Sequence, residues 1–177
     1  MAYSKLFAEI IIAHLVGCGV RFHRSRFQTD NGCEFVGNWQ AKSESKFTEA
    51  VESVKGLRHH RIPARAHTWQ SDVETVHRLI EDEFYEVEQF SSRRDFLEKA
   101  RAYNLWFNVA RRNSGKEDQT PWEIIHEREP KVSPAICALL PVFLDELFMK
   151  KLDSKLLWGY DLIPHPLWST PPSHGCN

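Results

Sequence analysis

Two carboxylates of this sequence, Asp30 and Glu74, lie where each could take part in chemistry. Asp30 closes an extended run that ends in Thr29, and it is followed by Asn31 and Gly32, a pair that favours a turn. Glu74 falls in the first turn of a helix expected from about residue 71, so a rigid element could bring it towards Asp30. The spacing therefore predicts a site at the end of a strand where two carboxylates could bind a metal ion.

The residues around these carboxylates form an ordered pattern. In chain order it consists of Thr29-Asp30-Asn31-Gly32, Glu34-Phe35, an amphipathic stretch, Pro63, Gln70-Ser71 and Asp72-Val73-Glu74. This order resembles the catalytic core of DDE integrases and transposases, the superfamily of retroviral integrases and insertion-sequence transposases. The resemblance covers roughly residues 3–127.

The resemblance implies a fold, a reaction and a set of partners. The fold would be α/β, a ribonuclease H-like mixed sheet flanked by helices. Asp30 and Glu74 would be catalytic and would bind Mg²⁺ or Mn²⁺, and the complete protein would process DNA ends and transfer strands. The resemblance also places Gln70, His77 and Arg78 near DNA, and a homo-oligomer is possible.

One part of the family pattern is missing. The family's first catalytic aspartate lies on its first strand, and three strands precede the helix that leads to the position of Asp30. Three average strands and one helix need about 28 residues before any loop is counted, and 29 residues precede Asp30 here. Among these the sole acidic residue is Glu9, which falls on an expected helix. We therefore expect an N-terminally truncated core that is inactive alone.

Two other functions compete with this interpretation. A non-catalytic transposase remnant would act only as an interaction or structural module through its long helices. A stand-alone ribonuclease H-like nuclease would need the first strand and its acidic residue, which the pattern lacks.

Apolar spacing predicts four helices. They are expected over residues 3–16, from Phe47 to about residue 57, from Ser71 onwards, and from Ser92 to near Asn113. The triple isoleucine at 10–12 leaves a buried strand as the alternative for the first of these. In the helix from Ser71, the residues expected in the core are Val73, Val76, Ile80, Phe84 and Val87, and those expected in solvent are Glu81, Asp82 and Glu86.

The resemblance predicts a strand over residues 20–29, where the apolar residues themselves alternate poorly. Residues 58–67 are expected as an extended basic run. Thr120, Pro121 and Glu123 have the spacing of a helix N-terminus. Residues 1–130 would form the partial core, and 131–177 a helical C-terminal extension that ends in a loosely ordered tail.

The bulk composition limits the class of protein. The 177 residues are 42% hydrophobic and 27% charged, which suits one globular domain, and the net charge of -1 means that any DNA contact must come from local patches. The four cysteines are scattered without a metal-binding or disulfide spacing, which favours a cytoplasmic location. The longest apolar run is too short to cross a membrane, so no membrane partner is expected.

Overall fold

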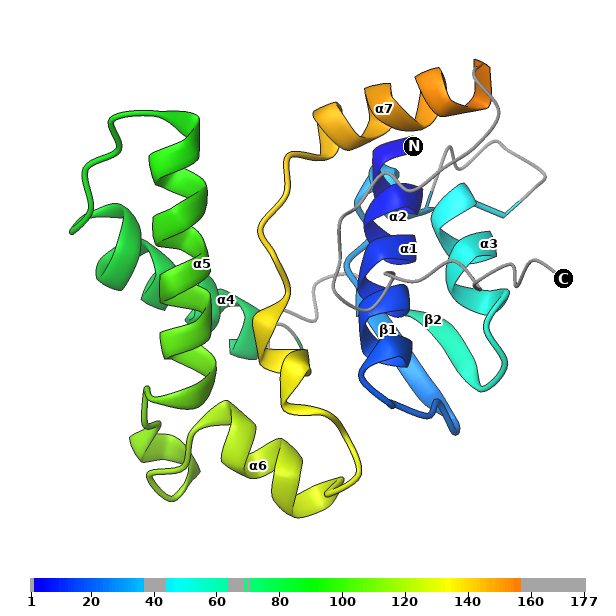
Figure 1. Ribbon diagram of the computed structural model, residues 1–177. Helices are drawn as coiled ribbons and strands as arrows, with labels where there is room; N and C mark the ends of the chain where they lie inside the picture. The colour runs from blue at the N-terminus through cyan, green and yellow to red at the C-terminus, as the bar shows by residue number, and fades with distance from the viewer. Residues whose placement is uncertain (1, 37–43, 64–68, 70, 157–177) are drawn as a thin grey trace, which may run out of the picture.

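The computed structural model describes residues 2–36, 44–63, 69 and 71–156, which Figure 1 draws in colour. Within these ranges the protein is mixed α/β and mostly helical, with one small parallel sheet of two strands. The predicted α/β class is confirmed at this coarse level. Two groups of elements are distinguished below: the strand-bearing part, residues 2–63, and the helical arm, residues 71–128.

The strand-bearing part begins with α1 (Ala2–Gly17), which confirms the helix predicted over 3–16 and makes the alternative strand wrong. The strand β1 (Ser25–Thr29) is shorter than the expected 20–29, because Arg24 takes a left-handed φ of 53° that interrupts an extended chain. Two helices follow, α2 (Cys33–Val36) and α3 (Lys46–Glu52). The strand β2 (Leu57–Arg61) takes up the start of the predicted basic run.

The two strands are parallel, with Ser25 opposite Leu57 and Thr29 opposite Arg61. Parallel neighbours need a crossover connection, and here α2 and α3 provide it. The core lies between α1, α3 and the sheet. Its buried residues are Ala8, Ile12, Phe47, Val51 and Leu57.

The helical arm contains α4 (Ser71–Ile80), a π-helical segment η2 (Glu81–Tyr85), α5 (Arg93–Val109) and α6 (Pro121–Arg128). A short 3₁₀ turn, η3 (Ser114–Lys116), precedes α6. In Figure 1, α5 lies on the opposite side of α1 from α3. The expected helix starts are confirmed. The Ser92 hydroxyl accepts from the backbone N–H of Asp95, and Thr120 and Glu123 form a reciprocal capping box with Pro121 at the first helical position.

The predicted burial of the helix from Ser71 is largely wrong. Val73, Val76 and Val87 are 52%, 38% and 69% exposed, and Phe84 alone of the expected stripe is fully buried. The expected exposure of Glu81, Asp82 and Glu86 is confirmed. Two features explain the error. The π-helical segment changes the phase of the residues after Ile80, and the stripe borders an open groove instead of a packed layer.

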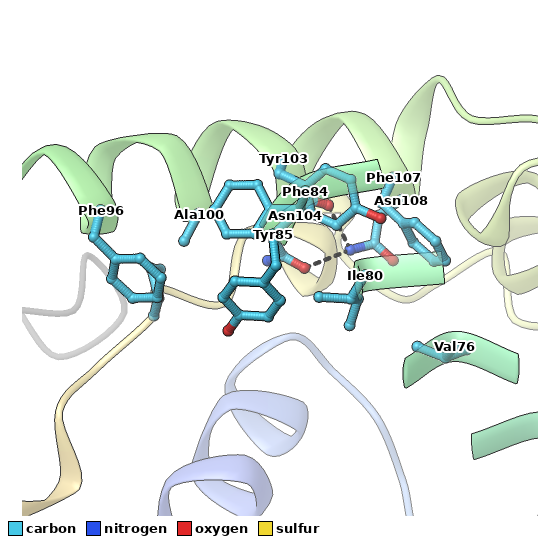
Figure 2. A pocket seen from close by; sticks show the side chains of 11 residues that line it. Val76, Ile80, Phe84, Tyr85, Phe96, Ala100, Tyr103, Asn104, Phe107 and Asn108 are labelled. Atoms are coloured by element: carbon cyan, nitrogen blue, oxygen red, sulfur yellow. Dashed lines mark hydrogen bonds between the residues drawn. The ribbon is translucent and has the colours of Figure 1, made fainter. Parts of the chain in front are cut away.

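Figure 2 shows this groove, which runs between α4, η2 and α5 and has a volume of about 400 Å³. Its lining is mainly apolar and aromatic. Ile80, Phe84 and Tyr103 lie along it, and Asn104 and Asn108 are joined by a hydrogen bond of 3.0 Å between their side chains.

The chain after residue 130 returns to the strand-bearing part. The 3₁₀ segment η4 (Pro134–Ala138) meets the end of α1, where the backbone N–H of Ser133 donates to Cys18 O at 2.8 Å. Helix α7 (Leu144–Leu156) reaches the start of α1, where Tyr3 and Phe148 have ring centroids 4.9 Å apart. Residues 157–177, where the loosely ordered end of the C-terminal extension is expected, lie outside the described residues. Of the helices in the described part of the chain, none has the length and apolarity needed to cross a bilayer.

Candidate catalytic edge of the sheet

The candidate site begins where the two parallel strands end together. The backbone N–H of Ile62 donates to Thr29 O at 3.0 Å, and Asn31 Nδ2 donates to Ile62 O at 2.8 Å. These bonds continue the pairing of the strands beyond their last residues. The carboxyl ends of parallel strands are where α/β proteins usually bind their ligands, and Asp30 is the first residue after β1.

Asp30 is exposed and held in a local turn. Its Oδ1 accepts a hydrogen bond of 2.9 Å from the backbone N–H of Gly32. The carboxylate of Glu34 lies over the same glycine, only 2.6 Å from where a Cβ would stand. The expected Asn-Gly turn is therefore present, and it directs the Asp30 carboxylate to the solvent side of this edge.

Glu74 lies in the first turn of α4 and is exposed. One hydrogen bond links the segments that carry the two carboxylates: Gln28 Nε2, from β1, donates to Trp69 O at 2.9 Å, and Trp69 comes two residues before α4. The residue two positions before α4 is thereby hydrogen-bonded to the strand that precedes Asp30.

Of the three residues expected near DNA, the structure describes His77 and Arg78. His77 and Arg78 are exposed in the last turn of α4. They follow Glu74 by three and four residues, so all three share one face of the helix. Gln70 lies outside the described residues.

The donor chemistry of this edge suits a magnesium ion held by few protein ligands. Asp30 and Glu74 offer exposed carboxylate oxygens, which are hard ligands, and Mg²⁺ commonly keeps several waters beside one or two carboxylates. Across the described ranges, no three side chains of the types His, Cys, Asp or Glu are grouped as a metal site.

His59, directly behind this edge, has a role that was not predicted from the sequence. Its Nε2 lies 2.8 Å from the Thr29 hydroxyl and its Nδ1 lies 2.8 Å from the Thr48 hydroxyl, so the ring bridges the end of β1 and α3. Burial and the neighbouring Arg61 lower the pKa of His59. The alternation of side chains along a strand could have revealed this role, because it places His59 on the same side of β2 as the core residue Leu57.

A second missed group holds the helical arm together. The Arg111 guanidinium donates to both carboxylate oxygens of Glu83, at 2.7 and 2.6 Å, and the Tyr103 hydroxyl donates to Glu83 Oε2 at 3.2 Å. These bonds lower the pKa of Glu83, while burial and the Glu83 charge raise the pKa of Tyr103 to about 12. The cluster joins η2 to α5 and has a structural role.

The chain has no match among protein-family models, curated proteins or solved structures.

Proposed function

We propose that this chain is part of a DDE-type integrase or transposase catalytic core with a ribonuclease H-like fold in its complete form. Asp30 and Glu74 are its two carboxylates, Mg²⁺ or Mn²⁺ its metal, and the ends of a mobile DNA element its substrate. The observation that carries the proposal is the Gln28–Trp69 hydrogen bond, which joins the residue two positions before the Glu74 helix to the strand that precedes Asp30.

In this proposal each residue has a distinct task. Asp30 and Glu74 hold the metal, which when bound supplies the charge that activates the attacking oxygen and stabilises the leaving one. Thr29 and Asn31 fix the strand end through their hydrogen bonds to Asp30 O and Ile62 O. His77 and Arg78 face DNA beside Glu74. A third carboxylate is needed for two ions.

Metal binding by the purified chain tests this proposal. We expect Mn²⁺ to bind weakly, as measured by electron paramagnetic resonance, and we expect Asp30→Asn and Glu74→Gln each to weaken binding by about tenfold or more. Glu81→Gln, an exposed carboxylate change one residue beyond α4, is the matched control and should leave binding unchanged. Equal loss in the control would reject the site.

Activity gives a second test. With labelled DNA and either metal, this chain alone should produce no cleavage or strand transfer, because the proposed site supplies two of the three carboxylates that the family uses. Cleavage that disappears in both Asp30→Asn and Glu74→Gln would mean that another group, such as Glu9 or Glu34, completes the site.

The exposed stripe of α4 favours a second candidate, an interaction module without chemistry. Val73 and Val76 are unusually exposed for an apolar helix face, and Val76 lines the groove of Figure 2. In that case the chain should form a homo-oligomer or bind a partner through the arm while Asp30→Asn has no effect. Light scattering of the wild type and of Val76→Asp distinguishes this case from a monomer.

A further inference from the structure

The sheet has one face packed against helices and one face that carries exposed polar residues. On the packed face, Phe27 and His59 contact Phe47 of α3, with ring centroids 5.4 and 4.9 Å away. Successive residues of a strand point to opposite sides, so Arg26, Gln28, Arg58 and His60 belong to the other face. Arg26, Gln28 and Arg58 are exposed. Parallel sheets normally have both faces covered, so this face requires an explanation.

The strand register concentrates positive charge on the open face. Arg26 lies directly opposite Arg58, and Gln28 lies directly opposite His60. Like charges side by side on neighbouring strands are unfavourable. The Arg58 side chain is 72% exposed and has a long ion pair, 3.8 Å to Glu52. Two neighbouring arginines thus place positive charge on this solvent-exposed face.

An aromatic ring completes this surface. Trp69 is 51% exposed, and its indole stacks on the His60 ring with centroids 5.9 Å apart and planes 20° apart. The hydrogen bond from Gln28 to Trp69 O fixes this segment against the sheet. His60 Nε2 is buried and has no hydrogen-bond partner within the described part of the chain.

We propose that this open face, made of Arg26, Gln28, Arg58, His60 and Trp69, binds single-stranded DNA. Guanidinium groups match phosphate oxygens with paired hydrogen bonds, and an exposed aromatic ring gives a base a platform for stacking. An acidic peptide would use the arginines but would gain nothing from the indole. The two arginines and the exposed indole together favour a nucleic-acid strand as the ligand of this face.

The orientation of the face connects it to the candidate site. Alternation along β1 from Arg26 through Gln28 leads to Asp30 at the strand end. A strand bound along this face would therefore approach Asp30. This last step depends on the proposed function, whereas the binding itself needs neither metal nor catalysis.

Fluorescence anisotropy with a labelled single-stranded oligonucleotide, in a metal chelator, tests the binding. We expect Arg26→Gln combined with Arg58→Gln to weaken binding and to reduce the slope of log affinity against log salt by about 1.4, because each lost phosphate contact removes about 0.7. Trp69→Leu should weaken binding by about tenfold with an unchanged slope. A duplex of the same sequence should bind less tightly, because its bases are not free to stack.

The matched control removes the same charge elsewhere: Arg94→Gln combined with Arg101→Gln, both exposed on α5, should leave binding unchanged. A second control, Arg26→Lys combined with Arg58→Lys, keeps the positive charge. It shows whether a loss of binding comes from the lost charge or from misfolding. It should retain the salt slope, and circular dichroism should match the wild type. Equal losses in the α5 control, or equal affinity for heparin and single-stranded DNA, would overturn the proposal. Neither result would affect the Mn²⁺ test of the Asp30 and Glu74 site.

Discussion

The strand-bearing part and the helical arm bury their apolar residues to very different extents. In the strand-bearing part, Ala8, Phe47 and Val51 are completely buried, and three elements meet around them. Over residues 71–128 only Phe84 and Thr120 are buried. The first part has a core of its own, whereas the arm depends on one aromatic cluster and a few polar contacts.

This difference shows what each region can do. A buried apolar core holds the ends of β1 and β2 in a fixed register. Such a rigid support suits a site in which the position of Asp30 must be accurate. The arm leaves an apolar stripe and a groove exposed, which suits contact with another surface. The five predictions below test this contrast, from the largest expected effect to the smallest.

Replacing Phe47 by Ala should have the largest effect. The ring is fully buried and contacts Phe27, Phe35 and His59. Its loss should lower the free energy of unfolding by about 3–5 kcal/mol, measured by urea denaturation. Phe90→Ala, at a ring that is 37% exposed in the arm, is the matched control and should cost clearly less. Equal costs would mean that the arm is as well packed as the core.

Breaking the Glu83–Arg111 pair should have the next largest effect. Arg111→Met leaves the partly buried Glu83 carboxylate with only the Tyr103 hydroxyl, and we expect a loss of about 1.5–3 kcal/mol. Arg112→Met, at an exposed neighbour, is the control.

The same pair gives the arm a pH dependence. Because the pKa of Glu83 is lowered in the folded protein, its stabilising contribution is complete above the ordinary value of 4.5 and is lost as the pH falls through the folded pKa. Thermal unfolding of the wild type should therefore show a steeper loss below pH 4.5 than that of Arg111→Met. Parallel curves would contradict this account.

Local signals in the sequence predicted the parts of the fold that depend on neighbours along the chain. Ser92 and Thr120 begin their helices as expected, since a cap needs only the next three residues. The burial of Val73 and Val76 could not be predicted, because a stripe at helical spacing shows which face is apolar but not whether anything covers it. The left-handed Arg24 has no such local signal.

The candidate site was predictable to the same extent. The Asn-Gly turn after Asp30 and the helical position of Glu74 follow from the sequence. The long-range contacts of the neighbouring residues do not. Gln28 to Trp69 and Thr29 to His59 join residues 41 and 30 positions apart, and such pairs depend on tertiary packing.

His59 should make the strand-bearing part sensitive to mild acid. Its pKa is lowered in the folded protein, so the unfolded chain takes up a proton first as the pH falls below 6.5. Stability should be complete above pH 6.5 and should decrease as the pH falls towards the folded pKa. Thermal unfolding between pH 7.5 and 5 measures this decrease. His59→Gln should flatten the curve, whereas His23→Gln, at an exposed histidine, should leave it unchanged.

The smallest effect is expected for Val73→Ala in the arm. Val73 is 52% exposed, so little apolar surface is lost, and Ala favours a helix over Val by about half a kcal/mol. The variant should therefore unfold within about 0.5 kcal/mol of the wild type. Val51→Ala makes the same change at a side chain with 0% exposure in α3 and should cost about 2 kcal/mol. If Val73→Ala cost as much as Val51→Ala, and if that cost grew with protein concentration, the stripe of α4 would be buried against a second copy in solution. The arm would then be a packed interface, and the interaction module would be the better account of this protein.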